Sequence, residues 1–137
     1  MKTATRITLL LLALLMCFSF ASCKSAEAWE TEVYDADTEL GEGEKTVTVK
    51  VLTETSEITF IIHTDAKTLG EALLAHKLVA GEDGAYGLYI KRVNGVLADY
   101  EVDGHYWNFT KAGETMLVGV DSAEIADGEQ YELTRTK

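Results

Sequence analysis

Apolar and polar residues alternate along two neighbouring stretches, residues 47–51 and 57–63. A period of two sends successive side chains to opposite faces of a strand, so each stretch is predicted to form a strand with one buried face. The polar connection at residues 53–56 is short enough to make the pair an antiparallel hairpin. The apolar positions of this face are Val47, Val49, Val51, Ile58, Phe60 and Ile62.

A helix is predicted to begin at Thr68. Residues 68–71 read Thr-Leu-Gly-Glu, a capping box in which Thr68 accepts from the N–H of Glu71 while Glu71 accepts from that of Thr68. We expect the helix to end before Gly81, which can take a left-handed cap because it has no Cβ. Its apolar side comprises Leu69, Ala72, Leu73 and His76, with Leu74 and Leu78 on the flanks.

Short strands are predicted after the helix, at residues 88–93, 96–98, 105–110, 114–118 and 130–135. Asn94-Gly95 has the residues of a type I′ turn, and Gly113 and Gly128 mark further breaks. The order strand, strand, helix, strands is typical of an α+β fold in which one helix lies across one face of a mixed sheet. A right-handed crossover would place the strand after the helix beside the first strand, which is the β-grasp arrangement of ubiquitin.

The predicted core combines apolar residues from all of these elements. Burial contributes about 1.5–3 kcal/mol for each such side chain, which is enough for a domain of this size without disulfides. The predicted members are Val47, Val49, Val51, Ile58, Phe60, Ile62, Leu69, Leu73, Leu88, Trp107, Phe109, Val118 and Leu133.

The first 22 residues have the features of an export signal. Two basic residues precede an apolar run at residues 7–18, which is too short to span a bilayer comfortably. Small residues then lead into Cys23, and Phe-Ala-Ser-Cys at residues 20–23 resembles the lipobox of bacterial lipoproteins, with Phe20 in place of the usual Leu. We therefore expect lipidation at Cys23 rather than at Cys17, where the large Met16 precedes the cut. Plain secretion is the alternative.

Residues 23–45 are rich in acidic side chains, eight between residues 24 and 45, and are predicted to form a flexible spacer. A cation-binding strip is the alternative, but the acids show no spaced ligand pattern. The remaining residues, 46–137, form the predicted domain. With 12 basic and 23 acidic residues the chain carries a formal charge of −11, which argues against nucleic acid as a partner.

Tyrosines gather after the helix, around turns that contain Gly84 and Gly87. A tyrosine offers a large ring, little entropy to lose and a hydroxyl for orientation, so such a cluster suits a flat amphipathic ligand. The alternative is that each ring only covers the half-exposed side of a strand. Trp107 is assigned to the core, although a register error of one residue would exchange it with its neighbour. The candidate ligand-binding residues are Tyr86, Tyr89, Tyr100, Tyr106 and Asn108.

From Val47 onward the sequence resembles bacterial surface domains of unknown function that are related to the C-terminal β-domain of the transcobalamin and intrinsic-factor carriers. The matching stretches are residues 68–73, 84–89, 93–95, 98–100, 106–109, 119–122 and 127–133. In the carriers a helical domain and the β-domain close on the corrinoid from opposite sides, and this chain has no helical half. The resemblance therefore implies one wall of a corrinoid site, with weak binding or capture shared with another protein.

These observations together indicate an extracytoplasmic lipoprotein of the cell membrane that binds a ligand. Its expected partners are the membrane, through the lipid anchor, a corrinoid or other small ligand, and a transporter or surface protein. No resident cofactor and no enzyme activity are predicted, because no Gly-x-Ser-x-Gly motif or phosphate-binding glycine loop is present. The alternative function is a structural or interaction module that pairs through an exposed sheet edge or face.

Metal binding is a further alternative that the residues leave open. Residues 99–104 imitate the first half of a calcium loop, but the twelfth position, which should be a bidentate Glu, is Thr110. His63, His76 and His105 have none of the close spacings of a zinc site. Exposed loop acids and surface histidines are the simpler interpretation.

Overall fold

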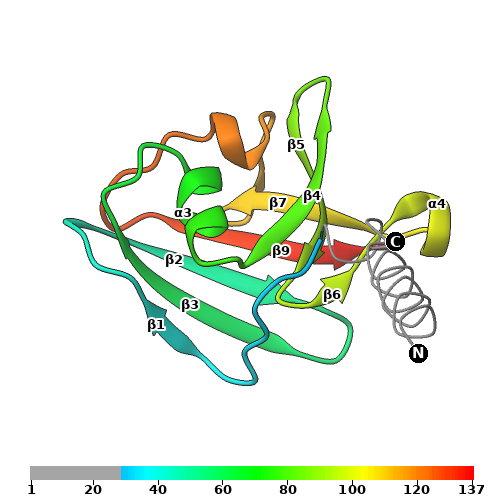
Figure 1. Cartoon of the computed structure of the whole chain (residues 1–137), viewed down its shortest axis with the longest axis horizontal. Coiled ribbons are helices and arrows are strands. Elements are labelled where there is room, and N and C mark those ends of the chain that lie inside the picture. Colours follow the sequence, from blue (N-terminus) through cyan, green and yellow to red (C-terminus); the bar gives the residue numbers. More distant parts are fainter. Residues whose placement is uncertain (1–28) are drawn as a thin grey trace, which may run out of the picture.

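The computed structural model describes residues 29–137 and contains two β-sheets, a helix of about two turns, α3, and a shorter helix, α4 (Figure 1). The predicted signal peptide and Cys23 lie outside the described residues. Within residues 29–137 no helix has the length and hydropathy needed to cross a bilayer. The elements are β1 (Thr38–Leu40), β2 (Lys45–Leu52), β3 (Glu57–Thr64), α3 (Leu69–Ala75), β4 (Val79–Gly84), β5 (Gly87–Val93), β6 (Val96–Leu97), α4 (Tyr100–Asp103), β7 (Tyr106–Lys111), β8 (Glu114–Thr115), the 3₁₀ helix η2 (Val120–Ser122) and β9 (Gln130–Thr136).

The larger sheet has six strands in the order β1-β3-β2-β9-β7-β8. β2 and β3 form the predicted antiparallel hairpin, with Val49 opposite Phe60. β9 lies parallel to β2, with Val51 opposite Leu133, and β7 pairs antiparallel with β9. The sheet is therefore mixed, and α3 lies across one of its faces (Figure 1). This agrees in outline with the α+β class predicted from the sequence.

A second sheet of three strands, β4-β5-β6, replaces part of the predicted arrangement. The sequence places the strand after the helix beside the first strand, but that place is taken by β9, and β4 pairs with β5 instead. Residues 79–84 were not predicted as a strand. The physical reason is local: a tight turn after Gly84 brings β5 directly back onto β4, and closing a short loop costs less entropy than pairing across a long crossover.

Most of the predicted core is buried. Val47, Val49, Val51, Phe60, Ile62, Leu69, Leu73, Trp107 and Leu133 are buried, and Ile58, Leu88 and Phe109 are partly buried against them. Val118 was assigned to the core wrongly, since it is 46% exposed. The prediction also missed Tyr131 and Val120, each 1% exposed, which pack in the same cluster. The phenol of Tyr131 reaches a carboxylate, Glu129, at the edge of the core, and this pairing lets a tyrosine be buried.

Residues 29–45 contact the domain rather than forming a free spacer. β1 pairs parallel with β3, and the Tyr34 ring meets the Phe60 ring edge-on, with the centroids 5.5 Å apart. The buried side chain of Asn94 accepts from the Tyr34 N–H at 2.7 Å and donates to the Tyr34 carbonyl at 3.0 Å. Acidic composition alone therefore misplaced the boundary of the domain, because the few apolar residues of this segment have specific partners.

The predicted cap of α3 is present in part. The Thr68 hydroxyl accepts from the Glu71 N–H at 3.3 Å, but the Glu71 carboxylate accepts from the N–H of Lys67 rather than that of Thr68. The helix ends before Gly81, as expected, but its last residue is Ala75 and Gly81 does not cap it. Lys77 takes the left-handed conformation with φ of 52°, and Gly81 lies in β4.

Glu129 gives the core a dependence on pH. Its carboxylate accepts from the Tyr131 hydroxyl and pairs with Lys111. Burial alone would raise the pKa of Glu129, but the bonds from Lys111, Tyr131 and the Ala126 N–H, together with the charge of Lys111, outweigh it and hold the pKa below its ordinary value of 4.5. Such a carboxyl stabilises the fold above its unfolded-state pKa, and the contribution is lost as the pH falls through the folded-state value.

We therefore expect the free energy of unfolding to decrease as the pH falls below about 4.5, and to decrease less steeply in Glu129→Gln. Urea unfolding of both proteins between about pH 3 and pH 6 measures the two slopes. The difference between the slopes isolates Glu129 from the other carboxyls, and equal slopes would refute its role.

Candidate ligand-binding surface

The structure divides the five predicted site residues into two groups. Tyr86 lies in the turn between β4 and β5 and is 93% exposed, Tyr89 lies on β5, and Tyr100 begins α4. Tyr89 shares one pocket with Tyr86 and another with Tyr100. Tyr106 and Asn108 lie on β7 of the larger sheet, on the face opposite Trp107, and neither lines the pockets described below.

The tip of the β4–β5 hairpin carries the most exposed apolar side chains of the described chain. Tyr86 is joined there by Leu117, which is 98% exposed, and by Val118, and these residues line an open pocket of ≈ 400 Å³. A neighbouring pocket of ≈ 300 Å³ extends over residues 84–89 to Gly119. We call Tyr86, Tyr89, Leu117 and Val118 the tip surface. An exposed apolar group of this kind is typical of a site that contacts a ligand or another protein.

Asp121 fixes the two segments of the tip surface to each other. Its carboxylate accepts from the Leu88 N–H at 3.0 Å. Gly87 has φ of +100°, and a Cβ there would lie 2.4 Å from the Asp121 carboxylate, so glycine is required for this close approach. The hairpin and the loop before η2 are thus held together before any ligand arrives. The sequence missed Leu117 and Val118, and their only signal was an apolar run that we assigned to a strand.

A third pocket, of ≈ 390 Å³, lies around Lys91 and shares Tyr89 with the pocket over residues 84–89. The Lys91 ammonium lies 3.0 Å from Asp99 and 3.6 Å from Glu82, and it faces the rings of Trp29 and Tyr89. The hydrogen bond to Asp99 raises the pKa of Lys91 above its ordinary value. The positive charge of Lys91 is therefore already balanced by carboxylates of the protein, Asp99 and Glu82.

The same contacts account for the acids that imitate a calcium loop. Asp99 caps α4 and pairs with Lys91, and the Asp103 carboxylate accepts from the backbone of His105 and from Arg135. The bond from the His105 N–H is the largest of the effects that lower the pKa of Asp103. The first and last acids of the pattern, Asp99 and Asp103, thus have partners within the protein.

His76, the C-cap residue of α3, lies near His63, since its ring and the His63 carbonyl both approach Gly41. His63 contacts Glu39 at 2.5 Å and so joins β3 to β1, whereas His105 lies 3.1 Å from Glu54. Residues 29–137 contain no group of three or more His, Cys, Asp or Glu side chains placed to hold a metal ion.

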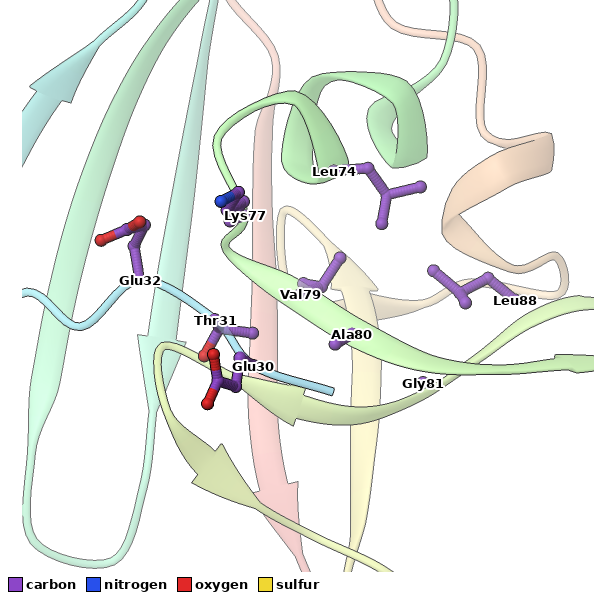
Figure 2. A pocket seen from close by; sticks show the side chains of 9 residues that line it. All are labelled: Glu30, Thr31, Glu32, Leu74, Lys77, Val79, Ala80, Gly81 and Leu88. Carbon is purple, nitrogen blue, oxygen red and sulfur yellow. The ribbon is translucent and has the colours of Figure 1, made fainter. Parts of the chain in front are cut away.

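A fourth pocket, of ≈ 460 Å³, lies between α3, β4 and the segment 30–32 (Figure 2). Leu74 and Leu88 lie on one side of it and Glu30 and Glu32 on the other, with both carboxylates turned away from the leucines (Figure 2). Sequence reasoning missed this pocket, because residues 30–32 were assigned to the spacer.

Comparison with known proteins places this geometry in context. A structure from Ruminococcus gnavus ATCC 29149, described provisionally as that of a metal binding protein, is 40% identical, with a TM-score of 0.65, and covers 69% of this chain and 98% of its own. The structure of haptocorrin in complex with Cbi is 19% identical, with a TM-score of 0.51, and covers 72% of this chain and 26% of that one. At this identity, the comparison with haptocorrin shows only that the two folds are similar. No curated protein matches the chain. Residues 66–136 match a family described as a domain of unknown function, DUF4430, and the chain therefore belongs to that family.

Proposed function

We propose that the protein is a non-catalytic binding module, lipid-anchored through Cys23 outside the cytoplasm, whose tip surface contacts a flat amphipathic ligand. The observation that carries the proposal is the gathering of Tyr86, Leu117 and Val118 at one exposed end of a hairpin that Asp121 holds to the loop before η2. Aromatic rings on a fixed scaffold lose little entropy on binding, and the tyrosine hydroxyl can orient the ligand.

A corrinoid is the first candidate for this ligand. The fold resembles part of haptocorrin, which was solved in complex with Cbi, and this chain spans 26% of that protein. Because fold likeness does not transfer function, the candidate rests on the tip surface as well. A single open surface encloses a ligand on one side only, so we expect weak binding by the isolated chain, or capture shared with a transporter or surface protein.

Titration with cobinamide and with cobalamin tests the proposal. We expect a visible-absorbance change and measurable heat with residues 24–137, and binding weakened by at least about tenfold in Tyr86→Ala and Leu117→Ala, which corresponds to about 1.4 kcal/mol or more. Tyr106→Ala, which removes a tyrosine outside the tip surface, should bind like the wild type. Unchanged binding in both tip variants would contradict the proposal.

Metal binding is the second candidate, because the relative from Ruminococcus gnavus is provisionally described in that way. The same titration cells can receive Ca²⁺ or Zn²⁺ alone. Saturable heat with an ion, together with none with either corrinoid, would favour this candidate over the first.

We also propose that the larger sheet and α3 form a β-grasp fold. The support is the neighbouring parallel pair β2 and β9, with β3 and β7 antiparallel on either side.

A further inference from the structure

The pocket between α3, β4 and residues 30–32, which we call the strap groove, has two chemically different walls. One wall is apolar and comprises Leu74, Val79 and Leu88 (Figure 2). The other wall is the segment Glu30, Thr31 and Glu32, in which both carboxylates are exposed. The strap groove has a volume of ≈ 460 Å³, which is within the range of small-molecule sites, about 300–1,000 Å³.

The acidic wall is bonded to the backbone of Gly95 and of Lys77. The Thr31 hydroxyl accepts from the Gly95 N–H at 2.5 Å, and the Glu32 N–H donates to the Lys77 carbonyl at 2.8 Å. Just before the segment, the Trp29 ring faces the Lys91 ammonium. Glu30 and Glu32 therefore have fixed backbones, and a ligand would not have to order them.

The charges of the groove favour a cation. Within residues 29–137, neither Glu30 nor Glu32 forms an ion pair with a basic side chain. The basic residue that lines the groove is Lys77. Two carboxylates against one ammonium leave the groove negative, in a chain whose formal charge is −11. An acidic field attracts cations and repels anions, and an apolar wall opposite the acids adds contact area for an uncharged body.

We propose that the strap groove binds a ligand that joins an ammonium group to an apolar body of about the size of indole. The ammonium lies against Glu30 and Glu32, and the apolar body lies on Leu74 and Leu88. This inference does not depend on the proposed function. Leu88 borders both sites, but the other residues of the groove lie away from the tip surface.

Two probes with the same ring and opposite charges test the inference, tryptamine and indole-3-propionate. They are titrated into ¹⁵N-labelled residues 24–137, which include every described residue. We expect saturable amide shifts at Ala80, Gly81 and Leu88 with tryptamine, and binding of indole-3-propionate at least about tenfold weaker. Equal affinities, no saturation, or shifts centred elsewhere would overturn the proposal.

Variants assign the selectivity to the strap. The double variant Glu30→Gln, Glu32→Gln should bring the two affinities to within about threefold, and Lys77→Gln should strengthen tryptamine binding by removing a repelling charge. Glu114→Gln, an exposed acid on β8, is the matched control and should change neither. Since these side chains are exposed, the fold should be retained, which an unchanged melting temperature verifies. Selectivity that survives in the double variant would overturn the assignment.

Discussion

A chain that begins at residue 46 is expected to be less stable than one that begins at residue 24 by at least about 3 kcal/mol. The shorter chain lacks β1, which pairs with β3, and lacks Tyr34, whose ring meets the buried Phe60 ring. An aromatic pair of this geometry contributes about 0.5–1.5 kcal/mol beyond the area that it buries.

The larger part of the loss comes from Asn94, which is 7% exposed. Its side chain exchanges two hydrogen bonds with the backbone of Tyr34, at 2.7 Å and 3.0 Å. Each buried polar group left without a partner costs about 1–3 kcal/mol. Asn94 also lies in the turn between β5 and β6, so the lost bonds include one anchor of the second sheet to the N-terminal segment.

Urea unfolding of the two chains measures this difference, and Tyr34→Ala in the longer chain should reproduce only part of it. If both chains unfold at the same urea concentration with the same slope, residues 29–45 are a spacer after all, as their composition suggests.

Trp107→Ala is expected to destabilise the protein by about 3–5 kcal/mol, whereas Tyr106→Ala should cost no more than about 1 kcal/mol. Trp107 is 8% exposed and its indole N–H donates to the Lys91 carbonyl at 3.3 Å, which joins β7 to the second sheet. Tyr106 is 39% exposed on the opposite face of β7. Removing the indole therefore leaves a cavity between the sheets, and removing the phenol does not.

Thermal and urea unfolding of the two variants give the comparison. Equal losses, or a larger loss in Tyr106→Ala, would mean that β7 is displaced in register by one residue.

The sequence was most informative where one local rule determined the structure. The alternation around Val49 and Phe60 predicted the β2–β3 hairpin, and Thr68 predicted the start of α3. Asn94-Gly95 has positive φ at both residues, as the predicted type I′ turn requires. In these places neighbouring residues alone fix the backbone.

Elements that depend on distant partners were not predictable in this way. β1 lies in an acidic segment, and its place is set by β3 and by the Tyr34 contact, neither of which is local. Val118 is apolar, as core residues usually are, but the loop that carries it extends to the tip of the β4–β5 hairpin.

Of the tip surface, the sequence predicted Tyr86 and Tyr89 as candidates, whereas the third tyrosine of that segment, Tyr100, lines a different pocket. Leu117 and the acidic wall of the strap groove required the tertiary structure.

The most direct test of ligand binding by the tip surface is an amide chemical-shift map of ¹⁵N-labelled residues 24–137 titrated with cobinamide. We expect saturable shifts confined to residues 84–89 and 117–119, which lie far apart in the sequence but meet at the hairpin tip. Shifts centred on β7, around Tyr106 and Asn108, or no saturable shift at high micromolar ligand, would contradict this expectation.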